Sequence, residues 1–291
     1  MRCYSFLIVS FLLGHLMGAS TRADSNEFDR FIAEYSVSNE AYRPHRHHGD
    51  ETLHFSHPLI AESPTPDTKI RFDYSFSNGK PGREESPSGD LHTFRAEFEY
   101  AFASWLSIEV DVPYSLLSAD TGSDQDQFNT VEVALKYANF SLAEKNLVFG
   151  GGIELGLPTG KDEEGIGSDH ILDVEPFVDF GYKIDSLEIV GFTSFGIPTN
   201  EGAENETDLE LGWNLSFLYH ATESIEAILE FDGTSAFDGE EDGFASANVT
   251  PGVKFQPFDD PNFEVGLGLS IPLAQDRDFD VQPILSIFYH F

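Results

Sequence analysis

Acidic side chains alternate with apolar ones through most of this chain. The recurring acids are Glu97, Glu99, Glu109, Asp111, Glu132, Glu154, Asp173, Glu175, Asp179, Glu210 and Glu230. Alternate side chains of a β-strand point to opposite faces, so each of these acids shares a face with other polar residues. In a closed barrel that face lines the interior, where carboxylates attract cations and exclude anions. The alternative is a solvated wall in which the acids pair with bases and have no role in selectivity.

Histidines gather upstream of the alternating region. They are His45, His47, His48, His54 and His57, with Asp50 and Glu51 between them. Imidazole nitrogens bind zinc, copper or nickel. The spacing matches no structural zinc pattern and includes no thiolate, so two interpretations stay open: a metal site, or a solvated polar stretch. The sequence predicts no other cofactor.

The elements that would position the acids are alternating segments separated by turn residues. They cover 70–76, 94–102, 106–114, 131–137, 147–157, 172–182, 187–197, 209–219, 225–231, 245–255, 263–271 and 279–291. The segment 187–197 is the least regular, because Val190 and Phe192 fall on its polar face. These segments predict about twelve strands of roughly ten residues, the usual strand length of membrane barrels. Long acidic connections follow the odd-numbered strands, and mostly shorter connections follow the even-numbered strands. Membrane barrels have long loops outside and short turns in the periplasm, so this pattern predicts that both termini are periplasmic.

A soluble β-sandwich would also alternate, but its strands are shorter. Here aromatic residues sit at the ends of apolar faces, as at Tyr114, Tyr137, Tyr182, Tyr219 and Phe231. Such positions are typical of the aromatic girdles of membrane barrels. The predicted fold is therefore all-β: a transmembrane, up-and-down antiparallel β-barrel over 67–291.

The residues before the barrel fall into two parts. Residues 1–23 have an apolar run after Arg2 and small residues before an expected cleavage site at Asp24, a pattern that predicts a signal peptide. Residues 24–66 contain a helical spacing at Phe28, Phe31, Ile32 and Tyr35 and are rich in histidine and proline. They form either a loose periplasmic arm or a plug in the lumen. The formal net charge of −35 excludes nucleic acid as a partner.

The end of the chain resembles the assembly signal of bacterial outer-membrane barrels. Ile287, Tyr289 and Phe291 alternate, and the chain stops on the aromatic residue. This resemblance implies the cell outer membrane as location, and the barrel-assembly machinery, outer-membrane lipids and lipopolysaccharide as partners.

A second resemblance lies where a strand meets an acidic loop. Residues Gly156, Leu157, Pro158, Thr159 and Gly160 are similar to a motif of the outer-membrane transporters of the MetA-pathway phenol-degradation family. The resemblance implies a channel for small molecules, with aromatic or hydrophobic compounds among the permeants.

Two other functions stay open. A structural or adhesive barrel would use its acidic outer loops. A lipid-modifying enzyme would need a nucleophile, a base and an orienting acid. Ser286 and His290 share a face, but the sequence places no acid beside them. The chain is therefore expected not to be an enzyme.

Overall fold

The computed structural model describes residues 53–82, 87–160, 169–199, 209–237 and 242–291. The predicted signal peptide, the predicted helix near Phe28, and His45, His47 and His48 lie outside these residues. The described part of the chain is made of β-strands and one short 3-10 helix, η1 (Ala143–Lys145). None of its helices is long and apolar enough to cross a bilayer.

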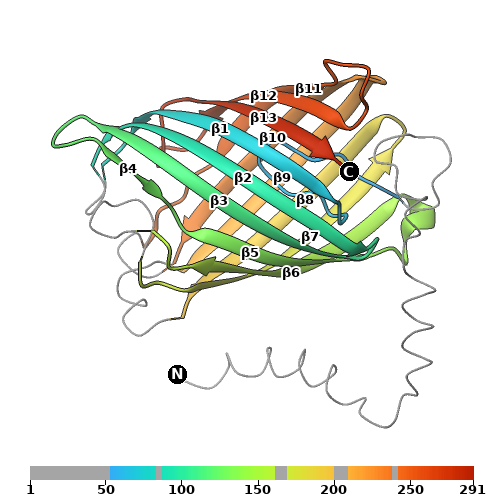
Figure 1. The fold of residues 1–291 in the computed structure, drawn as a ribbon, viewed down its shortest axis with the longest axis horizontal. Coiled ribbons are helices and arrows are strands. Elements are labelled where there is room, and N and C mark those ends of the chain that lie inside the picture. The colour runs from blue at the N-terminus through green and yellow to red at the C-terminus, as the bar shows by residue number, and fades with distance from the viewer. Residues whose placement is uncertain (1–52, 83–86, 161–168, 200–208, 238–241) are drawn as a thin grey trace, which may run out of the picture. The chain divides into compact units, whose positions relative to one another are not determined.

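The strands form one antiparallel sheet that closes on itself (Figure 1). They are β1 (Lys69–Lys80), β2 (Gly89–Ala103), β3 (Leu106–Ala119), β4 (Gln125–Phe128), β5 (Val131–Asn139), β6 (Leu147–Leu157), β7 (Asp173–Ile184), β8 (Leu187–Pro198), β9 (Glu210–Thr222), β10 (Ile225–Ala236), β11 (Asn248–Phe255), β12 (Phe263–Pro272) and β13 (Gln282–His290). All but β4 belong to a barrel of 12 strands, which confirms the predicted fold.

The barrel closes where its first strand meets its last. Strand β1 pairs with β13 from Lys69 opposite His290 to Ser75 opposite Ile284. The other barrel strands pair with their neighbours in sequence, and β3 pairs with β5 past the short β4. Closure leaves no barrel strand with an open edge, so every strand finds hydrogen-bond partners on both sides.

The two faces of the sheet separate apolar from charged residues as the alternation predicts. On β1, Phe72 is 50% exposed on the outer face, whereas Arg71 beside it is 0% exposed. The same contrast holds on β2, where Phe98 points out and Glu97 is fully buried inside. Exposed apolar side chains on most barrel strands give the barrel an apolar outer surface.

Tight turns join the strands at one end of the barrel. The turn between β7 and β8 uses Asp185 at a φ of 51°, and Asn146 after η1 has a φ of 59°. Asp and Asn tolerate this left-handed conformation better than most residues. The longer connections, including those at 158–172 and 273–281, lie at the other end.

Strand β4 lies in the long acidic connection that the sequence predicts after the segment 106–114. It pairs with the end of β3, from Tyr114 opposite Phe128 to Leu117 opposite Gln125. Strand β3 continues to Ala119, beyond the predicted segment. The four residues of β4 are too few to show an alternation, so the pattern could not reveal them.

Candidate functional site

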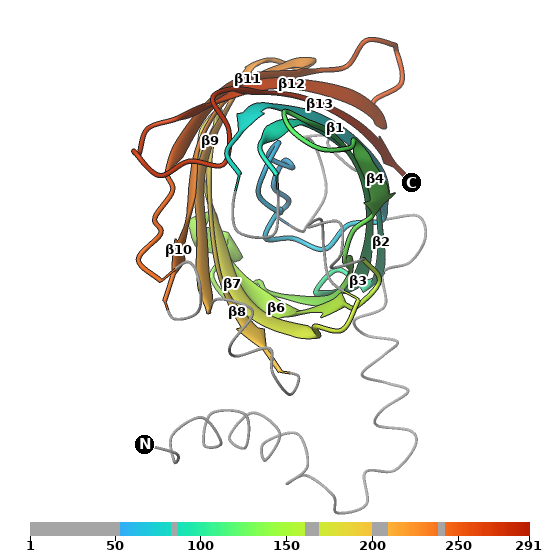
Figure 2. The same ribbon diagram turned by 90° about the vertical axis from the view of Figure 1, so that its left-hand side faces the viewer.

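Residues 53–68 run through the inside of the barrel instead of lying outside it. Figure 2 shows this segment in blue within the ring of strands. Its side chains are mostly buried: Phe55 and Leu59 are each 2% exposed, and His57 is 1% exposed. We call residues 53–68 the lumen segment. The described residues 53–66 lie inside the barrel, and the choice between an arm and a plug for 24–66 as a whole stays a prediction.

The wall of the barrel holds the backbone of the lumen segment through two buried carboxylates. Glu230 on β10 accepts hydrogen bonds from the amide nitrogens of Leu59 at 2.6 Å and Ile60 at 3.3 Å. Glu188 on β8 accepts one from the amide nitrogen of Ser56 at 2.8 Å. Hydrogen bonds from backbone amides stabilise a buried carboxylate in place of the water molecules that it has lost.

Basic side chains of the wall bind the carbonyl oxygens of the same segment. Lys254 on β11 donates to the carbonyl of His57 at 3.0 Å, and Lys183 on β7 donates to that of His54 at 3.1 Å. Arg71 donates to the carbonyl of Leu59. Acids therefore hold the amides and bases hold the carbonyls, so the extended backbone is bound along both of its polar edges.

Two apolar side chains anchor the segment between these polar contacts. A Cβ atom built on Gly252 would lie 2.6 Å from Leu59, and one built on Gly266 would lie 2.4 Å from it, so glycine makes room for this leucine. Gly181 makes room for Phe55 in the same way. The core cluster combines both anchors with lumen-facing residues of the wall: Ala138, Val148, Val190, Leu218 and Ile228. The irregular apolar position at Val190 is thus part of the surface that receives the lumen segment.

We expect Leu59→Ala to loosen the lumen segment, since emptying a buried leucine pocket costs about 2–5 kcal/mol. A cysteine introduced at Ala61 would report the loosening in protein lacking residues 1–23, which hold the only native cysteine. A free-energy change of about 1.4 kcal/mol is tenfold in an equilibrium constant. Labelling by a hydrophilic thiol reagent should therefore be on the order of 30-fold faster or more.

Leu273→Ala is the matched control, because Leu273 is 60% exposed outside the lumen. It should leave the labelling rate unchanged. Equal labelling rates in the two variants would contradict the assignment of Leu59 as an anchor.

A dense network of ion pairs lies beside the lumen segment. Lys69 Nζ contacts Glu99 Oε2 at 2.6 Å, Glu62 Oε2 at 3.6 Å and Glu109 Oε2 at 3.6 Å, and also bonds Glu97. Lys136 Nζ lies 3.3–3.4 Å from Glu99, Glu109 and Glu62. Because Glu62 belongs to the lumen segment and the rest to the wall, the network ties the two together.

The charge of Glu62 depends on these bases. Burial alone favours the neutral acid, but Lys69, Lys136 and Arg71 outweigh it and hold the pKa of Glu62 well below its usual range. The ionised carboxylate is therefore the stable form, and it keeps the ion pairs across the lumen intact.

The sequence-predicted lumen acids fall into two groups in the structure. Those paired with bases or with the lumen segment are Glu97, Glu99, Glu109, Asp111 and Glu230. Among the described residues, no base forms an ion pair with Glu132, Glu154, Asp173 or Glu175, which are partly accessible. Asp111 lies opposite Glu132, and Glu154 opposite Glu175, on paired strands. We call Glu132, Glu154, Asp173 and Glu175 the acidic wall.

Two predicted acids lie outside these groups. Asp179 is buried close to Gly150, where a Cβ atom would meet its Oδ1 at 2.1 Å. Glu210 is exposed at the start of β9. The selectivity roles of all these acids stay predictions.

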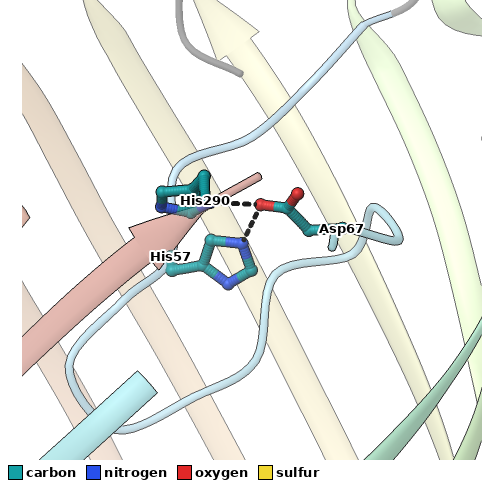
Figure 3. Close-up of side chains that lie close together, drawn as sticks. All are labelled: His57, Asp67 and His290. Atoms are coloured by element: carbon teal, nitrogen blue, oxygen red, sulfur yellow. Dashed lines mark hydrogen bonds and ion pairs between the residues drawn. The ribbon is translucent and has the colours of Figure 1, made fainter. Parts of the chain in front are cut away.

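His57, Asp67 and His290 converge at the end of the barrel where the chain closes (Figure 3). Asp67 Oδ2 lies 3.1 Å from His57 Nε2 and 2.6 Å from His290 Nδ1. Asp67 Oδ1 accepts a hydrogen bond from the amide of Thr68 at 2.6 Å, which fixes the carboxylate. Burial is the main cause that lowers the pKa of His57 well below its usual value, and the positive charge of Lys69 lowers it further. The ring of His57 is therefore neutral.

No family model matches the sequence, and no curated protein matches it. Solved structures match its architecture. An outer membrane channel from Pseudomonas putida F1 is similar with a TM-score of 0.59 and 14% identity, over 78% of this chain and 96% of that one. The NanC porin is similar with a TM-score of 0.51 and 10% identity, over 77% of this chain and 98% of that one. The fold is that of outer-membrane barrel channels. The resemblance to the MetA-pathway phenol-degradation family is not tested by these matches and stays a prediction.

The motif residues of that resemblance have a clear structural place. Gly156 and Leu157 end β6, and Pro158, Thr159 and Gly160 follow it. Thr159 Oγ1 accepts a hydrogen bond from the amide of Val131 at 2.8 Å and donates to the carbonyl of Asn129 at 2.9 Å. These bonds fix the entry to β5 beside the end of β6.

The terminal residues Ile287, Tyr289 and Phe291 lie on the outer face of the closing strand. Tyr289 is 39% and Phe291 58% exposed, and the amide of Phe291 donates to the carbonyl of Thr68 at 3.0 Å. Their placement fits the apolar outer surface. The role of these residues in assembly stays a prediction.

An acid does lie beside His290: Asp67 Oδ2 is 2.6 Å from His290 Nδ1. This corrects the statement that no acid is positioned to orient His290. Ser286 is four residues away on the same strand, about 13 Å at a strand's rise per residue. Ser286 and His290 therefore do not form a nucleophile–base pair.

Of the predicted metal-binding histidines, two belong to the described residues. His57 joins Asp67 and His290, while His54 is in none of the groups of described residues whose ligand atoms converge. Sequence reasoning missed His290 as a neighbour of His57 because His290 lies at the far end of the barrel region, 223 positions from Asp67. The glycines that meet Phe55 or Leu59, which are Gly181 on β7, Gly252 on β11 and Gly266 and Gly268 on β12, are the signal that could have revealed a buried occupant.

Proposed function

We propose that this chain is an outer-membrane channel for small molecules whose lumen segment closes the pore in the state described here. The observation that carries the proposal is the way the lumen segment is bound. Its backbone is held by hydrogen bonds with charged side chains of the wall. Water can form hydrogen bonds with the same side chains when the segment leaves. An occupant held in this way can be displaced without unfolding the strand ladder around it.

The surroundings follow from the apolar outer surface. We propose that outer-membrane lipids and lipopolysaccharide contact that surface, that the barrel-assembly machinery inserts the chain, and that both termini are periplasmic. The short turns lie at the same end of the barrel as the start of β1 and the end of β13, which supports this orientation.

The acidic wall supports a preference for cationic permeants. Its carboxylates form no ion pair among the described residues and are partly accessible, and ionised carboxylates in a lumen attract cations. Aromatic or hydrophobic permeants remain part of the proposal through the family resemblance. The stacked rings of Phe177 and Phe192 on the inner face, 5.4 Å apart, are compatible with an aromatic guest.

We expect Glu132→Gln, Glu154→Gln and Glu175→Gln together to reduce cation selectivity. The substitutions replace carboxylates by amides of the same shape, and they are made in protein lacking residues 24–66, so that the pore is open for the measurement. In a planar bilayer with a salt gradient, the reversal potential should move toward zero while the conductance changes little.

The control is Glu144→Gln, which removes one acid from η1 at the end of the barrel where the turns are short. A reversal potential that is the same in the triple variant and this control would reject the acidic wall as the origin of selectivity. Glu97 and Glu99 are unsuitable for this test, because both bind Lys69 and their neutralisation would disturb the ion-pair network.

A structural or adhesive barrel is the second candidate. The buried ion-pair network and the buried lumen segment would stabilise a permanently closed barrel equally well. It would show no conductance in any variant, including one without the lumen segment.

A further inference from the structure

We propose that His57, Asp67 and His290 form a binding site for a divalent transition-metal ion, Zn²⁺ in the first place, that fastens the lumen segment to the last strand of the barrel. The ligand atoms would be His57 Nε2, Asp67 Oδ2 and His290 Nδ1. These atoms already lie within 4.8 Å of one another. The site differs from the histidine cluster of the sequence, with which it shares only His57.

The geometry is close to that of a zinc centre. Bonds of about 2.0–2.1 Å in a tetrahedral site place neighbouring ligand atoms roughly 3.3–3.5 Å apart. The contacts of Asp67 Oδ2 with the two rings are 3.1 and 2.6 Å. Side-chain adjustments of about an ångström would therefore admit the ion, without any movement of the strands.

The donor set matches the chemistry of zinc. Two imidazoles and one carboxylate are the protein ligands of a zinc site that keeps a fourth position for water. A neutral imidazole offers a lone pair to the ion through a ring nitrogen. For a ring to bind the ion through the nitrogen that contacts Asp67, a proton on that nitrogen has to move to the other ring nitrogen. His57 Nδ1, which has no hydrogen-bond partner among the described residues, can take it.

A second group of converging acids shows why this site is distinctive. Glu62, Glu97, Glu99 and Glu109 also bring their oxygens within 4.8 Å of one another. The ammonium groups of Lys69 and Lys136 already sit between those oxygens and neutralise them. A metal ion would have to expel both lysines from a buried site, so that group is a salt-bridge network and not a metal site.

The ligands come from two stretches of the chain. His57 and Asp67 belong to the lumen segment, and His290 belongs to the end of β13. An ion that binds all three would link the occupant of the lumen to the closing strand. This consequence bears on the closed state proposed above, but metal binding itself can be measured without any channel activity.

The test is titration of the purified full chain in detergent with Zn²⁺ after treatment with a chelator. The background carries His45→Ala, His47→Ala and His48→Ala, so that the upstream histidines do not contribute. We expect one saturable Zn²⁺ per chain, and a tetrahedral absorption spectrum when Co²⁺ is used instead. His57→Ala and His290→Ala should each weaken binding by about 100-fold, because each removes one of three protein ligands.

His170→Ala serves as the matched control, because His170 is an exposed histidine in the connection before β7. It should bind Zn²⁺ like the background. His57→Ala lies outside the strands, so it keeps the test decisive even where the His290 variant does not fold. Absence of saturable binding in the background, or binding that His57→Ala leaves unchanged, would overturn the proposal. A failure of the proposed channel would appear only in conductance and would leave the titration as expected.

Discussion

Deletion of residues 24–66 is expected to turn a closed or weakly conducting barrel into one that conducts steadily. The described part of this stretch fills the interior and occupies the carboxylates of Glu188 and Glu230. Without it, water would solvate these groups and fill the lumen. A barrel of this strand number is wide enough to hold more than its own side chains, so we expect the single-channel conductance to rise on the order of tenfold.

The matched control for this deletion is removal of 24–52 alone, which leaves the lumen segment in place. It should conduct like the complete mature chain. The shift in gel mobility between heated and unheated samples would establish that both variants form a barrel. If the longer deletion forms a barrel and conducts no better than the control, the lumen segment does not close the pore.

Lys69→Met is expected to cause the largest loss of stability by a single substitution. The side chain of Lys69 is 0% exposed and neutralises carboxylates of both the wall and the lumen segment. Removal of one partner from a buried ion-pair network leaves charges without compensation and costs about 3–5 kcal/mol. Unfolding in urea, followed by the fluorescence of Trp105 and Trp213, would measure this loss.

Lys145→Met is the control, because Lys145 is exposed in η1. It should change the free energy of unfolding by less than about 0.5 kcal/mol. The double variant Lys69→Met with Glu99→Gln should recover part of the loss, since it removes one of the carboxylates left unpaired. An equal stability of Lys69→Met and Lys145→Met would contradict the role of the network.

The strand pattern could be predicted from the sequence because alternation is a local property. Each apolar position, such as Phe72 or Phe98, shows its face through its neighbours two residues away. Val190 was the informative exception, because its position on the polar face reflects its place in the buried cluster that also contains Phe55. Alternation alone cannot say whether such a residue meets lipid, water or an internal segment.

The pairing of charges could not be predicted, because it depends on strand register. Lys69 lies opposite Glu99 and Arg71 opposite Glu97 across β1 and β2. A shift of one residue would send these side chains to opposite faces. The contact between Asp67 and His290 joins residues 223 positions apart, so no local pattern points to it.

Closure of β1 against β13 has a consequence for how the chain folds. The lumen segment contacts Glu230 and Lys254 on late strands, at separations of 171 and 197 positions. These contacts cannot form until most of the barrel exists. The entropy cost of joining distant parts of a chain rises with the logarithm of their separation, so the seam is the most costly pairing to nucleate. The lumen segment contacts both sides of the seam, Arg71 on β1 and His290 on β13, and we expect these contacts to favour the register in which the two strands pair.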